Sequence, residues 1–291
     1  MHPRSVYRME WGSHRLELGR RTCVMGVVNV TPDSFSDGGR FLDSRAAIDQ
    51  GLRLAAAGAD IIDVGGESTR PFSEPVLADE EIQRVVPVIA ALAKTIRIPI
   101  SIDTTKAAVA RRALEAGAAM INDITALRSD PGLGALAAES GVPVVLMHMQ
   151  GEPRTMQVAP RYDDLVAEIR LFLQQAADAA EERGVPRARL IVDPGIGFGK
   201  TAEHNLELIR RLPEFAGLGL PLLVGPSRKA FIRRLVKPEG DHDISPDHPA
   251  VETGTQAAVA AAILKGAHIV RVHDVANTRA TLKVADAIMN S

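Results

Sequence analysis

The chain has 291 residues, of which 46% are hydrophobic, and its formal net charge is −2. This length and composition allow a large buried core and exclude a disordered chain. The small net charge excludes a broad basic surface for nucleic acid or membranes, which favours a small-molecule partner. No run reaches the roughly 20 apolar residues of a membrane span, and no signal peptide is expected. The one cysteine, Cys23, cannot form an internal disulfide, so we expect a cytoplasmic protein.

Short apolar runs recur along the chain, and each precedes a polar patch and then an Ala/Leu-rich stretch with helical periodicity. Eight such runs are predicted strands, at residues 24–28, 61–64, 98–102, 120–122, 142–147, 190–192, 222–224 and 269–272. The predicted helices include residues 45–57, 80–94, 107–116, 163–183 and 255–265. Glycines stand where several of these helices would end, at Gly58, Gly117, Gly184 and Gly266.

The strict alternation of apolar strands and helices predicts a parallel sheet covered by helices. Eight repeats in about 250 residues match an α/β fold of the (β/α)₈ or TIM barrel type. A doubly wound open sheet is the alternative, but it would usually carry G-x-G-x-x-G where this chain has NVTPDS. We therefore predict a single domain over 1–291, with an N-terminal extension at 1–22 and an excursion at 237–249.

Polar residues follow the predicted strands, where active sites of this fold collect. They are Asn29, Asp63, Asp103, Asn122, Asp123, His148, Asp193, Ser227, Arg228, Lys229, Arg271, His273 and Asp274. Each one alone is weak evidence, because an Asp after a strand is more often a helix N-cap and a lone His is more often structural. Their joint placement predicts that one mouth of the barrel is polar.

One grouping offers hydrogen-bond acceptors. Asp103, Asn122 and Asp193 present two carboxylates and an amide, which suit a flat heterocycle with several N–H donors along one edge. Because a carboxylate can accept two parallel N–H bonds, an amino-pyrimidinone edge is a plausible ligand.

A second grouping is cationic. Arg70 lies in GGESTRP, and Arg271 and His273 are two residues apart on one strand, so they point to the same face. Guanidinium and imidazole groups fit phosphate oxygens, although an ion pair with Glu67 or Asp274 is the alternative. Together the two groupings indicate a heterocycle that carries a phosphate or diphosphate ester.

Eight ordered motifs resemble those of the dihydropteroate synthase family over essentially the whole chain. They are NVTPDSFSDGG (29–39), DVGGESTRP (63–71), SIDT (101–104), IND (121–123), LMHMQG (146–151), DPGIGFGKT (193–201), SRK (227–229) and RVHDV (271–275). The resemblance implies condensation of 6-hydroxymethyl-7,8-dihydropterin diphosphate with 4-aminobenzoate to 7,8-dihydropteroate and diphosphate. It also implies a homodimer, a Mg²⁺ cofactor and a target of sulfonamides.

The resemblance also implies roles for individual residues. The pterin would be held by Asp103, Asn122, Asp193 and Lys229, with Phe198 as a wall. Mg²⁺ would take Asn29 as its protein ligand, the diphosphate would meet Arg70, Arg271 and His273, and the aminobenzoate would lie near Thr69 and Ser227. We expect the loop after Asn29 to close over the substrates, with Phe35 against the aminobenzoate and Asp37 on the pterin side. The residues expected to act in catalysis are Arg70, Asp103, Asp193, Lys229 and Arg271.

Some positions depart from the family pattern. Phe72 stands where the family usually has Gly, Pro226 and Ala230 flank the SRK motif, and an arginine often found before Gly254 is missing. Two alternatives to the synthase therefore stay open. One is a non-catalytic paralogue that binds a pterin without turnover, and the other is the pterin-binding methyltransferase domain that serves corrinoid proteins. The second has no reason to keep the diphosphate residues.

Overall fold

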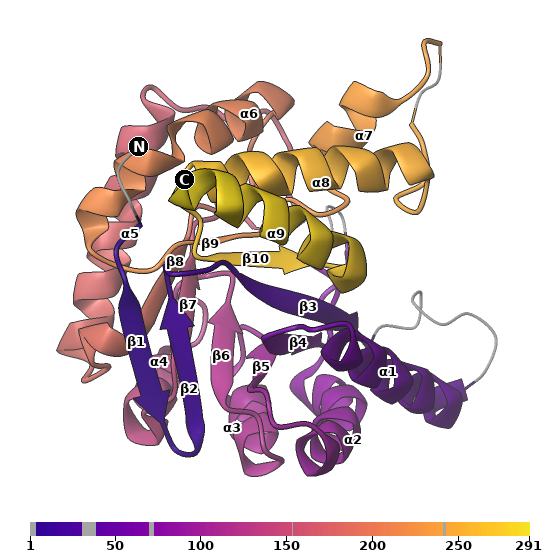
Figure 1. Ribbon diagram of the computed structural model, residues 1–291. Coiled ribbons are helices and arrows are strands. Elements are labelled where there is room, and N and C mark those ends of the chain that lie inside the picture. The colour runs from indigo at the N-terminus through magenta and orange to yellow at the C-terminus, as the bar shows by residue number, and fades with distance from the viewer. Residues whose placement is uncertain (1–3, 31–38, 70–72, 153, 241–242) are drawn as a thin grey trace.

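The computed structural model describes residues 4–30, 39–69, 73–152, 154–240 and 243–291 (Figure 1). Within these ranges, eight parallel strands form one sheet in the order β8-β7-β6-β5-β4-β3-β10-β9. A parallel bridge between Val192 and Leu222 joins its two edges and closes the barrel. The strands are β3 (Cys23–Asn29), β4 (Ile61–Gly65), β5 (Ile100–Asp103), β6 (Met120–Asp123), β7 (Val144–Met147), β8 (Leu190–Asp193), β9 (Leu223–Val224) and β10 (Ile269–Val272). The predicted (β/α)₈ barrel is confirmed.

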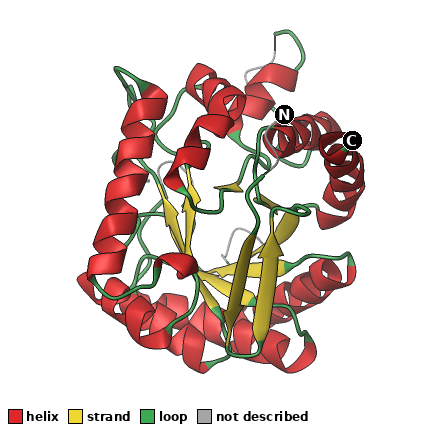
Figure 2. Ribbon diagram, turned by 60° about the vertical axis from the view of Figure 1, so that its left-hand side comes forward, coloured by secondary structure: helices red, strands yellow, loops and turns green. Residues whose placement is uncertain are grey.

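The helices surround the strands as an outer ring (Figure 2). They are α1 (Gly39–Ala56), α2 (Ala78–Thr95), α3 (Ala107–Glu115), α4 (Pro131–Ser140), α5 (Leu165–Glu182), α6 (Ala202–Arg211), α7 (Ala230–Val236), α8 (Pro249–Leu264) and α9 (Val275–Asn290), with short 3₁₀ turns η2 (Arg187–Arg189) and η3 (Leu212–Leu218). None of the helices in the described ranges combines the length and the apolar character needed to cross a bilayer.

Prolines account for three of the differences between the predicted and observed element boundaries. Strands β5 and β7 begin after Pro99 and Pro143, which cannot donate a backbone hydrogen bond to the ladder. Helix α8 begins at Pro249, six residues before the predicted start, because proline is well tolerated in the first helical turn. His248 caps this helix by accepting a hydrogen bond from the backbone N–H of Ala250.

The four glycines at predicted helix ends all adopt positive φ. The angles are 96° at Gly58, 109° at Gly117, 94° at Gly184 and 104° at Gly266. A residue with a Cβ is strained in this conformation, whereas glycine is not. The expectation that these glycines end helices is therefore confirmed, and each one turns the chain back toward the next strand.

The N-terminal extension forms an antiparallel hairpin across the amino ends of the barrel strands (Figure 2). Its strands are β1 (Tyr7–Trp11) and β2 (His14–Leu18), and they bury four apolar side chains: Met9, Trp11, Leu16 and Leu18. The indole Nε1 of Trp11 donates to the carbonyl oxygen of Ala119, directly before β6, at 2.6 Å. The hairpin thus closes the end of the barrel opposite the predicted site.

The excursion between α7 and α8 folds back onto α7 through ion pairs. Asp243 accepts three hydrogen bonds from the guanidinium of Arg233, and Asp247 pairs with Arg228. Arg228 lies just before α7 and Arg233 lies in its last turn, and both line the cavity at the carboxyl end of the barrel. This segment is therefore held next to the carboxyl end of the barrel.

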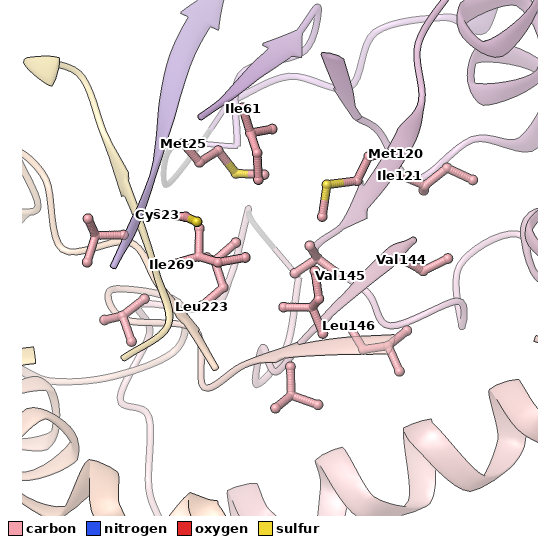
Figure 3. Packing of buried hydrophobic residues seen from close by; sticks show 14 of the residues in the cluster. Cys23, Met25, Ile61, Met120, Ile121, Val144, Val145, Leu146, Leu223 and Ile269 are labelled. Carbon is pink, nitrogen blue, oxygen red and sulfur yellow. The ribbon is translucent and has the colours of Figure 1, made fainter. Parts of the chain in front are cut away.

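The inner face of the barrel changes from apolar to polar along several strands. Near the hairpin, Met25, Ile61, Met120 and Val145 point toward one another, while Ile121 points outward to the helices (Figure 3). Because side chains alternate along a strand, the residues two positions further on also face inward. Those positions are polar on several strands: Asp63 on β4, Asp103 after Ser101 on β5, Asn122 on β6, Asp193 on β8 and Arg271 on β10.

Candidate active site

A cavity of ≈ 980 Å³ opens at the carboxyl ends of the barrel strands. Its lining includes many of the predicted site residues: Asn29, Thr69, Asp103, Ser227, Lys229, Arg271 and His273. Asn122, Asp193 and Phe198 are buried on the inner side of the same mouth, with 5%, 6% and 7% of their surface exposed. The fold therefore brings these ten residues together at one end of the barrel.

Burial raises the pKa values of two acidic residues of the site, Asp193 and Asp103. It raises the pKa of the Asp193 carboxyl to about 6, while the backbone N–H of Gly195, 2.7 Å from Oδ1, opposes the shift. Burial also raises the pKa of Asp103, against the opposing charge of Arg271. Both groups can accept hydrogen bonds from a ligand that brings N–H donors, and such a ligand would favour their ionised forms.

Arg271 bridges two carboxylates across the barrel interior. Its Nε donates to Oδ2 of Asp63 and its Nη2 donates to Oδ2 of Asp103, both at 2.7 Å. The guanidinium therefore lies against the acidic floor of the cavity. The diphosphate role expected for Arg271 stays a prediction. The sequence placed Asp63 at the polar mouth but did not predict its contact with Arg271.

The DPGIGFGKT loop supplies a wall, Phe198, against the cation Lys229 at the start of α7. The ammonium of Lys229 lies 3.9 Å from the centre of the Phe198 ring, which is a cation–π contact. Gly195 has a φ of 72°, and a Cβ there would lie 1.9 Å from the carbonyl oxygen of His148. Only glycine allows this close approach, which places Phe198 and Lys229 together beside Asp193.

Lys200 is a further cation at this site, and the sequence analysis gave it no role. Only 2% of its surface is exposed, and its Nζ lies 3.0 Å from Nδ1 of His148 and 2.9 Å from the carbonyl oxygen of Phe198. Burial lowers the pKa of Lys200 to about 7 and, together with this lysine, lowers the pKa of His148 to about 2. A neutral His148 with its proton on Nε2 can accept from Lys200 at Nδ1. The spacing of the GxGxGK motif does not predict that Lys200 contacts His148.

Ser227 and His273 come from different loops and meet at the mouth. The Ser227 hydroxyl lies 3.0 Å from Nδ1 of His273, and the His273 backbone N–H donates to the same hydroxyl at 3.3 Å. The sequence expected these residues at the aminobenzoate and the diphosphate respectively. Their contact makes the two expected subsites neighbours.

The loop that follows β4 is anchored by an ion-pair network. Lys106 donates to Glu67 at 2.5 Å and to Glu81 at 2.6 Å, and Glu81 is fully buried on α2. Glu67 also accepts a hydrogen bond from the backbone N–H of Val76. The loop carrying Thr69 is thereby fixed to α2 and to the amino end of α3.

Several predicted site residues lie outside the described ranges. These are Phe35, Asp37 and Arg70. Phe72, which departs from the family pattern, also lies outside these ranges. Within the described ranges, no group of three or more His, Cys, Asp or Glu side chains could hold a metal ion. Asn29 ends β3 and lines the cavity, so its amide oxygen is available to a ligand there.

These features define a class of protein, a (β/α)₈ barrel with an acceptor-rich, cation-flanked pocket for a heterocycle. The family model described as "Pterin binding enzyme" matches residues 25–273. The chain belongs to this pterin-binding enzyme family.

Known relatives agree with this assignment. Dihydropteroate synthase of Synechocystis is 49% identical over 277 residues, which cover 95% of this chain and 93% of the relative. A structure of Xanthomonas albilineans dihydropteroate synthase with 4-aminobenzoic acid is similar with a TM-score of 0.90 and 46% identity, covering 99% of this chain and 100% of that one. Another from the same organism, in complex with 7,8-dihydropteroate, has a TM-score of 0.86 at 44% identity, covering 98% and 99%.

Proposed function

We propose that this protein is a dihydropteroate synthase, a transferase that joins 6-hydroxymethyl-7,8-dihydropterin diphosphate to 4-aminobenzoate. The products are 7,8-dihydropteroate and diphosphate. The observation that carries the proposal is the layer of Asp103, Asn122 and Asp193 on the inner face of the barrel, beside the cation Lys229. Relatives that are dihydropteroate synthases at up to 49% identity over nearly the whole chain support the same reaction.

We assign the pterin to this buried layer. Its amino-pyrimidinone edge offers N–H donors to the Asp193 and Asp103 carboxylates and the Asn122 carbonyl, and its carbonyl oxygen accepts from the ammonium of Lys229. Phe198, over which Lys229 lies at 3.9 Å, provides an apolar wall for the ring. Raised carboxyl pKa values at this site support the assignment, because groups with perturbed pKa values gather where ligands bind.

In the reaction, the C–O bond between the pterin methylene and the diphosphate breaks, and its electron pair leaves with diphosphate. The positive charge on the methylene carbon is delocalised into the reduced pterin, near Asp103 and Asp193. The lone pair of the aminobenzoate nitrogen then forms the C–N bond, and the proton released from that nitrogen passes to solvent. The aromatic amine is neutral at pH 7, so the protein needs no strong general base. Its main task is to stabilise the departing polyanion, which we assign to Arg70, Arg271 and His273.

Asn29 fits the proposed Mg²⁺. An amide oxygen is the hard ligand that this ion prefers, and Mg²⁺ commonly takes few protein ligands together with substrate phosphates. Asn29 is half-buried at the end of β3 and lines the cavity, which agrees with such a site. When bound, Mg²⁺ would neutralise charge on the diphosphate.

The aminobenzoate is assigned to the outer part of the cavity. Thr69 and Ser227 line this part, and we expect Phe35 to cover the ring and Asp37 to lie on the pterin side when the loop after Asn29 closes. Ala230, the first residue of α7, also lines the cavity and offers no side-chain hydrogen bond. We further propose a cytoplasmic homodimer, which light scattering of the purified protein would test.

The reaction is tested with purified protein, Mg²⁺ and the two substrates, with dihydropteroate measured by chromatography. We expect product from the wild type and none above background from a matched preparation of Asp193→Asn. A wild type without product would contradict the synthase. Calorimetric binding of the pterin diphosphate without product would favour the non-catalytic paralogue.

Arg70→Ala gives a sharper test of the leaving-group assignment. Removing one preorganised charge from the departing diphosphate should lower kcat/KM on the order of a hundredfold. Unchanged steady-state kinetics in this variant would refute the role of Arg70.

A further inference from the structure

Asp63 is a buried acid on the inner face of the barrel, one strand away from Asp103. It lies on β4 with none of its surface exposed. Its Oδ2 accepts from Nε of Arg271 at 2.7 Å and from Nδ2 of Asn122 at 3.1 Å. Its Oδ1 is buried and has no donor in the part of the chain that the structure describes. Within the described ranges, the hydrogen bonds of this carboxylate therefore run to two residues of the proposed active site, Asn122 at the pterin and Arg271 at the diphosphate.

Asp123 is a second buried acid at a strand end, and its hydrogen bonds stabilise the local turn. It ends β6 and is also fully buried. Its oxygens accept from the backbone N–H and hydroxyl of Thr125 and from the backbone N–H of Leu127, at 2.6–2.8 Å. These contacts hold the turn after the strand. Among the described residues, Asp63 makes no such contact with a turn or a helix end, so local chain stability does not explain its burial.

The carboxylate decides how the Asn122 amide is oriented. An ionised carboxylate can only accept, so the amide must turn its nitrogen toward Asp63. The carbonyl oxygen of Asn122 is then the group left to accept from a ligand. With the opposite orientation the pocket would offer a donor at this point, which an N–H edge of a heterocycle cannot use.

The same carboxylate holds one end of the Arg271 guanidinium. Nε is bonded to Asp63 and Nη2 to Asp103, so the planar group is fixed between β4 and β5. Without Asp63, the guanidinium would pair with Asp103 alone and could rotate about that contact. More of the hydrogen bonds that Asp103 can accept would then be taken by Arg271, and fewer would remain for the ligand.

We propose that Asp63 is a positioning residue of the active site, which orients Asn122 for the heterocycle and Arg271 for the diphosphate of the same substrate without touching either. This inference rests on the proposed function, since it concerns the pterin pocket of that reaction. It predicts that loss of the Asp63 charge acts on one substrate only.

The test compares Asp63→Asn with Asp123→Asn as a matched control, because both changes remove the charge of a fully buried acid. In Asp63→Asn, the KM for the pterin diphosphate should rise by about tenfold to a hundredfold, with the KM for 4-aminobenzoate unchanged. Asp123→Asn should leave both values unchanged in the folded protein. Equal KM values for the pterin diphosphate in Asp63→Asn and an active wild type would overturn the inference but not the proposed function. A wild type without product would overturn both.

A double-mutant cycle tests whether Asp63 acts through Arg271. In an Arg271→Met background, the Asp63→Asn effect should shrink at least about threefold, because one of its two targets is gone. Fully additive effects would overturn the inference. If Asp63→Asn does not fold, nitrogen-15 NMR of the wild type replaces it, with the Arg271 Nε–H signal assigned by its loss in Arg271→Lys. That proton should be protected from exchange in the free protein, and fast exchange would equally overturn the inference.

Discussion

The two ends of the barrel are built from opposite kinds of contact. At the amino ends of the strands, the β1–β2 hairpin buries Trp11 and Leu18 against an apolar layer. At the carboxyl ends, Asp63, Asp193 and Lys200 are buried beside a cavity of ≈ 980 Å³. Burial of apolar surface stabilises the folded state, whereas burial of charge opposes it.

Stability and activity therefore depend on opposite ends of the barrel. Raised carboxyl pKa values at Asp103 and Asp193 and the lowered pKa of Lys200 all record burial of charge at the active end. No described residue of the hairpin lines the cavity. Substitutions at the two ends should therefore have opposite signatures in stability and activity.

The largest effect is expected for Trp11→Ala at the closed end. The variant loses a large buried side chain and the hydrogen bond to Ala119, so the free energy of unfolding should fall by about 3–5 kcal/mol. Below its melting transition, kcat/KM should stay within about twofold of the wild type. Urea denaturation and steady-state kinetics measure the two quantities. A kcat/KM that falls together with stability would break the separation of the two ends.

Asp193→Asn should show the reverse signature at the active end. It removes a charged acceptor, so pterin affinity measured by calorimetry should fall on the order of a hundredfold. Since the folded-state pKa of about 6 lies above the ordinary 3.8, this carboxylate reduces stability increasingly as pH rises from about 4 to 6, and fully above. At pH 8 the variant should therefore be more stable, by about 1–3 kcal/mol. A less stable variant would show that the acid also supports the fold.

The pH dependence of pterin binding sharpens the same point with the wild type. Asp193 faces Lys229, Lys200 and Arg271, and its pKa of about 6 means that it gains a proton as pH falls through that value. Because the protonated acid accepts less well, affinity should weaken by up to about tenfold for each pH unit below 6. Calorimetric titration between pH 5 and 8 checks this. The slope should be shallower in Asp193→Asn, because Asp103, whose pKa is also raised, is the remaining carboxylate that accepts from the pterin.

The smallest effect is expected at Cys23, which opens β3. Burial raises the pKa of its thiol to about 12, so the reactive thiolate is scarce at neutral pH. Alkylation by iodoacetamide should be undetectable in the native protein and complete after unfolding. Cys23→Ala should leave kcat/KM unchanged and reduce stability only by about 1 kcal/mol. Rapid native labelling, followed by mass spectrometry, would show that this end of the barrel opens.

The barrel was predictable because each strand is a continuous apolar run followed by a polar residue. The hairpin was not predicted, although YRMEW and HRLEL alternate as strands do, because two short segments give no clue to the surface that they cover. Likewise, the sequence placed Arg271 and His273 on one face of a strand. It could not show that Arg271 reaches Asp63, two strands away across the barrel, because that contact depends on the radius of the closed sheet.

Lys200 and Asp63 illustrate the limit for side chains in the site. Both residues lie in recognisable motifs, but their partners lie elsewhere in the chain. Lys200 contacts His148, directly after β7, and Asp63 contacts Asn122 on β6. Periodicity and spacing report on neighbours along one element, whereas these pairs depend on how separate elements meet. The roles of the two residues become visible only once burial and hydrogen-bond partners are known.

The order of strands carries a consequence for how the chain is made. The first barrel strand, β3, pairs with the last, β10, and Arg4 at the start of the chain binds Asp286 in the final helix. On the ribosome, one edge of β3 and a buried cation therefore have no partner until β10 and α9, far later in the chain, have been made. Nascent chains of this protein expose an open sheet edge until the last strand arrives, so truncated products should be the forms that aggregate.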